Sequence, residues 1–297
     1  MQKAGENINI QSFPQKIKNS IKHPVSLVFF ILIILSVLFT VISLGFLIGY
    51  ILFYGIPNLS PKLFAWHYTT ENVSMLPAIL NTIMMTVLAL VIAIPFGIGA
   101  AIYMVEYAKK GNKIVEVVRI TAETLTGIPS IVYGLFGMLF FVTTCKMGLS
   151  LLAGALTLSI MILPVIMRTT EEALLAVPDS FREGSFGLGA GKLRTVFRIV
   201  LPPAIPGISS GIILAMGRIV GETAALIYTA GTVAEIPKNI LSSGRTLAVH
   251  MYSLSSEGLY MAQAYATAVV LLVIVMLINL GSTFVAKKIN IRRNKNE

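Results

Sequence analysis

The longest uncharged stretch of the chain runs from Val25 to Tyr54 and reads VSLVFFILIILSVLFTVISLGFLIGYILFY. Asp, Glu, Lys and Arg are all absent between Lys22 and Lys62. About 20 consecutive apolar residues cross a bilayer as a helix, so this stretch predicts a transmembrane helix. A cleaved signal peptide does not fit, because its apolar region has about 7–15 residues and ends at a small-residue site.

Five further stretches along the chain have the length and apolar character of membrane spans. We therefore predict an all-α membrane protein with six transmembrane helices. The five stretches lie near Ala78–Tyr103, between Glu123 and Lys146, between Lys146 and Arg168, near Ala204–Ala230, and near Ala262–Ala286.

The composition agrees with a membrane protein. Hydrophobic residues make up 56% of the 297 residues and charged residues only 12%, whereas soluble domains contain about 25% charged residues. This excludes an ordinary soluble enzyme, a disordered chain and a fibrous protein. The single Cys145 excludes an internal disulfide framework, and the three histidines lack metal-ligand spacing. We expect no catalytic residue and no metal site.

Basic residues are distributed unevenly between the predicted loops. Of the 23 Lys and Arg, 18 lie in the two terminal tails, the second–third loop and the fourth–fifth loop. Cytoplasmic loops are enriched in these residues, so both termini are predicted to face the cytoplasm. The net charge of +10 then reflects topology, and we expect no nucleic-acid partner. The predicted segments are a cytoplasmic tail 1–24, a first span with an external loop 25–77, a core of five spans 78–288, and a basic tail 289–297.

The largest predicted cytoplasmic loop, residues 168–203, has a helical pattern of its own. Pro178-Asp179-Ser180 predicts a helix start, and Ser180 with Glu183 predicts a capping box. Glycines 187, 189 and 191 break this helix, and a second short helix is expected over Lys192–Val200 until Pro202-Pro203 ends it. We expect a protruding helix, bend and helix that offers apolar side chains to a partner, including Phe181, Leu193, Val196 and Phe197.

The same loop contains a glycine-rich run that does not form a nucleotide site. A phosphate-binding loop has the pattern G-x4-G-K-[ST]. When this pattern is aligned on Gly191 and Lys192, the chain has Phe186 in place of the first glycine and Leu193 in place of the Ser or Thr. We therefore expect no cofactor on this chain, and any ATP and Mg to be bound by a partner ATPase.

Two charged residues interrupt the fifth predicted span. Arg218 and Glu222 lie four residues apart, so they would share one face of a helix. Arg218 lies about 20 Å along that helix from Ala204, beyond the middle of the membrane, where ionisable residues face a cavity or a partner. The pair is either part of a translocation path for an oxyanion or a structural salt bridge. Arg168, at the cytoplasmic end of the fourth span, is either an anion contact or a positive-inside anchor.

The third predicted span contains a proline and three glycines within TGIPSIVYGLFG, from Thr126 to Gly137. Pro129 lacks a backbone donor and bends a helix. The bend is either a packing kink or part of a pore lining. The candidate residues are Gly127, Pro129, Ser130 and Tyr133.

Part of the loop 168–203 resembles the cytoplasmic EAA loop of ABC importer permeases, E-A-A-x3-G-x9-I-x-L-P. The matching residues keep the spacing, although Gly184 and Ser185 replace the two alanines. In that family the loop forms coupling helices that dock into a groove of the ATPase subunit. The resemblance implies an ATPase-coupling role for Ser180, Phe181, Glu183, Gly189, Ile199 and Pro202.

From about Ala78 to Lys288 the chain is similar to the permease subunits of phosphate ABC importers, most of all to the A type. The similarity rests on GIPSIVYGLFG from Gly127 and on MGRIVGETA from Met216. It implies the type I ABC importer permease fold, a bacterial or archaeal cytoplasmic membrane, and Arg218 and Glu222 as phosphate-path residues. The implied partners are a second similar permease, two ATPase subunits and an external phosphate-binding protein.

Other functions stay open at this point. A permease for sulfate, molybdate or a phosphonate needs the same arginine chemistry, and only the resemblance favours phosphate. An intramembrane enzyme or a channel is a further alternative, although the sequence contains no catalytic cluster and no sign of a selectivity filter.

Overall fold

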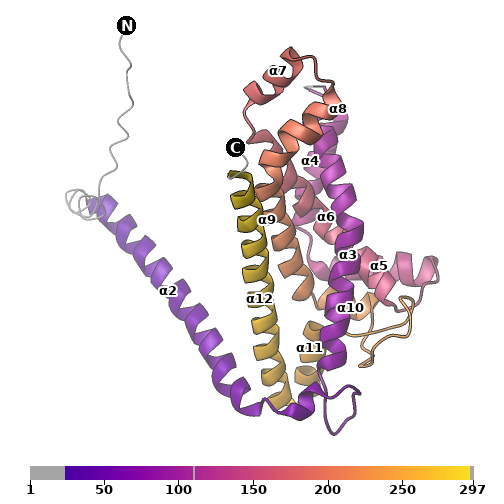
Figure 1. The fold of residues 1–297 in the computed structure, drawn as a ribbon. Helices are drawn as coiled ribbons and strands as arrows, with labels where there is room; N and C mark the ends of the chain where they lie inside the picture. Colours follow the sequence, from indigo (N-terminus) through magenta and orange to yellow (C-terminus); the bar gives the residue numbers. More distant parts are fainter. Residues whose placement is uncertain (1–23, 110, 295–297) are drawn as a thin grey trace. The chain divides into compact units, whose positions relative to one another are not determined.

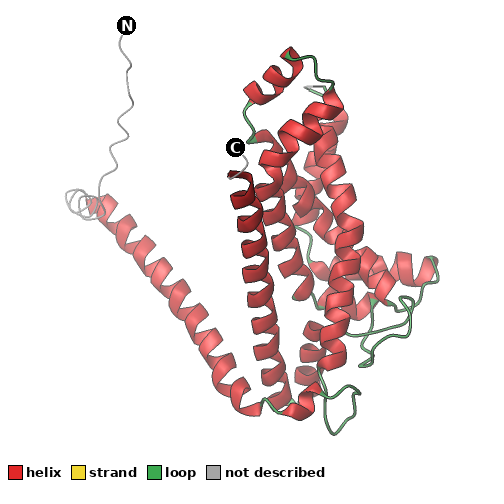
Figure 2. Ribbon diagram, in the orientation of Figure 1, coloured by secondary structure: helices red, strands yellow, loops and turns green. Residues whose placement is uncertain are grey.

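The computed structural model describes residues 24–109 and 111–294, so most of the predicted tail 1–24 lies outside the described residues. Every regular element in this part of the chain is helical (Figure 2). The chain separates into two compact units, residues 1–53 and 54–297.

The first unit contains one long helix, α2 (Pro24–Gly55), drawn in indigo in Figure 1. Its 32 residues carry no charge, and its apolar side chains are exposed over most of its length. A helix that is apolar on all sides requires an apolar environment. The exposed apolar surface of α2 agrees with the predicted transmembrane helix.

The second unit is built around four long helices that lie side by side (Figure 1). They are α3 (Leu76–Ile102, continued by η3, Tyr103–Tyr107), α6 (Leu151–Leu175), α9 (Leu201–Val220) and α12 (Met261–Asn294). With α2, five helices in the described part are long and apolar enough to cross a membrane.

The predicted third span is not a continuous helix. The stretch between Glu123 and Lys146 covers only the end of α4 (Lys113–Thr126), followed by α5 (Ser130–Gly137), which η4 (Met138–Thr144) continues. The two parts meet at 105°. The predicted number of six spans is reached only when this bent pair is counted as one. The helix α4 was not predicted, although Asn112 signals its start by accepting a hydrogen bond from the N–H of Ile114.

Short helices connect these elements. The remaining ones are η1 (Ile56–Asn58), η2 (Pro61–Phe64), α7 (Asp179–Gly187), α8 (Lys192–Thr195), η5 (Val196–Val200), α10 (Ala224–Thr229) and α11 (Leu247–Glu257). In the second unit, α7, α8 and the start of α4 lie at one end, here called the basic end (Figure 1). The residues 56–75, α11 and the start of α12 lie at the opposite end.

The core follows the long helices. Its central part joins α3, α6, α9 and α10 through buried side chains such as Met85, Leu158, Ile219 and Leu226. A second cluster at the basic end packs η5 and the start of α9 against α3, α4 and α6. The segment 56–75, predicted as an external loop, packs against α3, α11 and α12 through the buried Leu63. Both clusters fix the positions of the charged residues described next.

Candidate functional site

The two charged residues of the fifth span lie on different sides of a helix break. The helix α9 ends at Val220, so Arg218 lies in its last turn, where a cation interacts favourably with the helix dipole. Glu222 follows the helix end at Gly221. The prediction that the two residues share one helix face is therefore wrong, because the backbone leaves the helix between them.

Glu222 has a local structural role at this break. Its side chain is buried, and Oε1 accepts a hydrogen bond of 3.0 Å from the backbone N–H of Ala225. The carboxylate thereby caps the start of α10. Within the described residues no ion pair joins Arg218 and Glu222, so the alternative of a structural salt bridge between them is not realised in this conformation.

The broken third span packs directly against this break. A methyl group on Gly134 of α5 would lie 2.7 Å from the Cα of Ala225 in α10. Only a glycine permits this approach, because the neighbouring atom belongs to the backbone. Gly134 therefore allows α5 and α10 to pack closely.

Tyr133 connects the two parts of the third span. Its buried hydroxyl donates a hydrogen bond of 2.7 Å to the carbonyl oxygen of Leu125, on the other side of the break. This hydrogen bond joins α5 to the end of α4.

The other candidates of this stretch form the break itself. Gly127 terminates α4, Pro129 precedes the first residue of α5, and Ser130 is that first residue. Pro129 was expected to bend one helix, but the structure places it between two helices. A proline fits there because the first N–H groups of a helix lack intrahelical partners.

Two helix breaks thus meet inside the second unit, one at 127–129 and one at 221–223. Discontinuous helices in membrane transporters expose backbone groups and charged side chains to a central path. The region of the two breaks contains a guanidinium, a buried carboxylate and hydroxyl groups, from Arg218, Glu222 and Tyr133 with Ser130.

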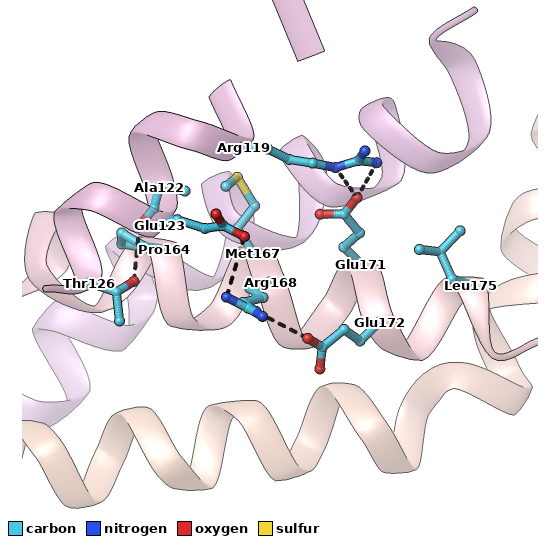
Figure 3. A pocket seen from close by; sticks show the side chains of 10 residues that line it. All are labelled: Arg119, Ala122, Glu123, Thr126, Pro164, Met167, Arg168, Glu171, Glu172 and Leu175. Atoms are coloured by element: carbon cyan, nitrogen blue, oxygen red, sulfur yellow. Dashed lines mark hydrogen bonds and ion pairs between the residues drawn. The ribbon is translucent and has the colours of Figure 1, made fainter. Parts of the chain in front are cut away.

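A second group of charges lies nearer the basic end, between α4 and α6 (Figure 3). A cavity of about 250 Å³ is lined there by two arginines and three glutamates. Arg119 pairs with the buried Glu171, while Arg168 pairs with Glu172 at 3.1 Å and with Glu123 at 3.6 Å. Sequence reasoning did not identify Arg119 and Glu171, because their juxtaposition depends on the packing of α4 against α6.

These ion pairs bear on the assignment of Arg168. Three carboxylates against two guanidinium groups give the cavity a negative balance, which opposes an oxyanion. Arg168 is more than half exposed and already holds two carboxylates. Its place in a substrate path stays a prediction that requires these ion pairs to open.

The loop between α6 and α9 forms the expected helix, bend and helix at the basic end (Figure 1). The predicted capping box is wrong: α7 already begins at Asp179, and Pro178 occupies the capping position without a side-chain hydrogen bond. The bend is confirmed at Gly189, whose φ of +81° favours glycine.

The second helix of this loop does not end at the predicted prolines. The chain stays helical from Lys192 through η5 and α9 to Val220. Pro202 and Pro203 are tolerated because they lie in the first turn of α9, directly after the wider π-helical turn η5. The prediction that Val196 is offered to a partner is wrong, because Val196 is fully buried. Phe181, Leu193 and Phe197 are exposed, as predicted.

An open groove lies within the loop. It has a volume of about 500 Å³, and several predicted coupling residues line it: Ser180, Phe181, Gly189 and Ile199. Glu183 and Pro202 do not line it. Leu188 beside it is 92% exposed, so an apolar surface faces outward from the basic end.

Arg182 fixes this loop to the long helices. Its side chain donates to Glu106 of η3 at 2.8 Å, and to the carbonyl oxygens of Val177 and Leu174 at the end of α6. Both charged side chains are largely buried. Sequence reasoning missed this pair, since Glu106 and Arg182 lie far apart in the chain.

The fold and these features define a class of membrane protein. Residues 93–292 match the family described as binding-protein-dependent transport system inner membrane component, and the chain belongs to this family. It is accordingly a multi-pass inner-membrane protein. The bacterial alginate ABC transporter, solved with its periplasmic protein, has the same fold: a TM-score of 0.67 at 15% identity, over 90% of this chain and 96% of that one.

Two named relatives are more similar in sequence. The probable ABC transporter permease protein YqgI of Bacillus subtilis is 34% identical over 82% of this chain and 88% of its own length. The phosphate transport system permease protein PstA 1 of Mycobacterium tuberculosis is 34% identical over 70% of this chain and 69% of its own length. Both are permease subunits by name, and the chain has the type I ABC importer permease fold.

Proposed function

We propose that this chain is a PstA-type permease subunit of an ATP-driven importer that moves inorganic phosphate into the cytoplasm. The name of the mycobacterial relative supports phosphate as the substrate, and the arginine at the helix break supports an oxyanion of some kind. The chain itself performs no chemistry on its substrate.

The observation that carries the proposal is the position of Arg218. Arg218 lies in the last turn of α9, and its guanidinium makes no ion pair with a carboxylate in the described part of the chain. A planar guanidinium donates two parallel hydrogen bonds to an oxyanion. Inside a membrane an unpaired arginine is costly, so it is retained where it meets a substrate or a partner.

The proposed assembly contains a second, similar permease, two ATPase subunits and an external phosphate-binding protein. The exposed apolar side chains of α7 and α8 would dock on an ATPase subunit, which binds ATP and Mg. Closure of the ATPase pair would move the loop and the helices attached to it. The translocation path between the two permeases would then open alternately to each side of the membrane.

A permease for another oxyanion is the alternative. Sulfate, molybdate and phosphonates would also bind a guanidinium, and the geometry of Arg218 does not select among them. Phosphate is preferred because it is the substrate in the name of the relative quoted above.

Uptake of labelled phosphate tests the proposal. Phosphate-starved cells with and without the chain are compared, with sulfate and molybdate as competitors. Loss of high-affinity phosphate uptake in the deletion strain, with no competition by the other anions in the parent, is expected. Unchanged phosphate uptake in the deletion strain would overturn the phosphate assignment, and copurification of an ATPase subunit would test the importer class separately.

A further inference from the structure

A buried arginine lies at the opposite end of the second unit, outside the path described above. Arg245 immediately precedes the capping residue of α11 and is only 6% exposed. Its guanidinium stacks on the ring of Tyr68, 4.8 Å from the ring centre. No carboxylate pairs with it in the described part of the chain. A buried charge without a counter-charge is strongly destabilising, so this position favours an anionic partner.

The neighbours of Arg245 are polar and equally buried. Asn81 of α3, Thr246 and His250 of α11 are each at most 2% exposed. The Nδ2 of Asn81 donates to the carbonyl oxygen of Arg245 at 3.1 Å, and the N–H of His250 donates to the carbonyl oxygen of Thr246. The ring of Tyr68 meets the His250 ring edge-on at 6.2 Å. These five side chains, called the Arg245 cluster below, come from three separate segments.

Several atoms of the Arg245 cluster lack hydrogen-bond partners among the described residues. They are Nε and Nη2 of Arg245, Oγ1 of Thr246, Oδ1 of Asn81, and both ring nitrogens of His250, which faces the Val73 backbone without normal hydrogen-bond geometry. Leaving one buried polar group unsatisfied costs about 1–3 kcal/mol. Six such atoms in one cluster indicate an occupant that both accepts and donates hydrogen bonds.

The chemistry of these atoms restricts the occupant. Arg245 and Thr246 supply donors at the N-terminal end of α11, where an anion is favoured. Oδ1 of Asn81 only accepts. Burial and the nearby Arg245 lower the pKa of His250 to about 3, so its ring is neutral near pH 7 and has one donor and one acceptor nitrogen. Chloride and sulfate offer no hydrogen to the two acceptors.

We propose that the Arg245 cluster binds a hydrogen-bearing oxyanion of the phosphate class, at a second site distinct from Arg218. Its non-protonated oxygens accept from Arg245 and Thr246, and its hydroxyl group donates to Asn81 or His250. A cavity of about 270 Å³ lies beside Tyr68 and is also lined by His67, Lys238 and Glu235. Tyr68 is the one member of the Arg245 cluster that lines it. The identity of the anion rests on the proposed phosphate import.

The test uses the full-length chain purified in detergent, in phosphate-free buffer. The thermal unfolding midpoint is measured while inorganic phosphate, sulfate or chloride is added at matched ionic strength. All variants carry Arg218→Gln, so that the proposed transport site does not contribute to the response. Phosphate is expected to raise the midpoint in this background and in the exposed-cation control Lys62→Gln. It is expected to have no effect when Arg245→Gln is added. Thr246→Val, which removes one donor without changing side-chain volume, is expected to weaken the phosphate response about tenfold.

Three outcomes would overturn the proposal. An undiminished phosphate response in Arg245→Gln would mean that the anion binds elsewhere. Equal responses to sulfate, chloride and phosphate would indicate a general salt effect. If Arg245→Gln does not fold, an unchanged affinity in Thr246→Val is decisive against the site. Because this readout does not involve transport, a chain that binds phosphate here without importing it would refute only the proposed function.

Discussion

At the scale of single residues, the helix break after α9 separates Arg218 from Glu222, which the sequence predicted to share one helix face and one role. Arg218 makes no ion pair with Glu222. Replacing Arg218 therefore does not deprive the buried Glu222 carboxylate of a partner. We predict that Arg218→Ala reduces phosphate uptake at least tenfold while the amount of chain in the membrane and its copurifying subunits stay at wild-type levels. Quantitative immunoblotting beside the uptake assay checks this. A loss of assembly in parallel with uptake would instead show that the arginine has a structural role.

Glu222 is predicted to behave differently. In Glu222→Gln the amide oxygen still accepts from the N–H of Ala225, so the cap of α10 persists and the fold is retained. In Glu222→Ala the cap is lost, which costs about 0.5–2 kcal/mol. We expect a lower thermal unfolding midpoint for the alanine variant only. Equal midpoints for both variants would contradict the capping role, and a loss of uptake in the glutamine variant would assign the negative charge to transport.

His250 makes the stability of the protein depend on pH. Burial and Arg245 lower its pKa to about 3 in the folded chain, against an ordinary value of about 6.5. Below pH 6.5 the unfolded chain binds a proton that the folded chain excludes, so stability falls as the pH falls. Between pH 6.5 and 5 this loss is about 2 kcal/mol.

The measurement is the unfolding midpoint at pH 7.5, 6.5 and 5 in phosphate-free buffer. His250→Gln is expected to flatten the pH dependence, and the exposed His67→Gln serves as the matched control. If both variants kept the wild-type pH profile, another titrating group would be responsible.

At the scale of elements, Arg182 and Glu106 hold α7 to the end of η3 and α6. Breaking a largely buried ion pair by removing one partner costs about 3–5 kcal/mol. We predict that Arg182→Gln weakens the coupling between the loop and the long helices, so ATP hydrolysis by the assembled transporter continues while uptake falls. The two rates are measured on the same preparation.

Asp179→Asn is the control for this prediction. Asp179 also pairs with Arg182, at 3.1 Å, but its side chain is 84% exposed, and such pairs contribute about 0–1 kcal/mol. Uptake and hydrolysis should both stay near wild-type values in this variant. If hydrolysis and uptake fell together in Arg182→Gln, the ion pair would be needed for assembly rather than for coupling.

The sequence predicted the helices better than their ends. Apolar composition decides where a helix can cross a membrane, and α2, α3, α6 and α12 lie where predicted. The ends depend on the local backbone conformation. Gly221 terminates α9 although the apolar pattern continues. The helix passes through Pro202 because a π-helical turn precedes it. Contacts between distant segments, such as Arg119 with Glu171, have no signal in a single sequence.

At the scale of the whole molecule, the uneven distribution of basic residues predicts which end faces the cytoplasm. Cys145 is the single cysteine of the chain and is exposed between η4 and α6, on the side predicted to be external. We predict that a membrane-impermeant maleimide labels Cys145 in intact cells. In the variant Cys145→Ser with Gly191→Cys, which moves the thiol to the basic end, labelling should require permeabilised cells. The reverse pattern would invert the topology.

The unbroken helical run from Lys192 to Val220 has a mechanical consequence. It begins in the exposed loop at the basic end and contains Arg218 in its last turn. A stiff rod of this kind acts as a lever arm about 35 Å long between Thr195 and Arg218, at about 1.5 Å per residue. Tilting it by about 5° displaces the guanidinium by about 3 Å, the length of one hydrogen bond. A small rocking motion at the basic end is therefore enough to make or release one hydrogen bond of the Arg218 guanidinium.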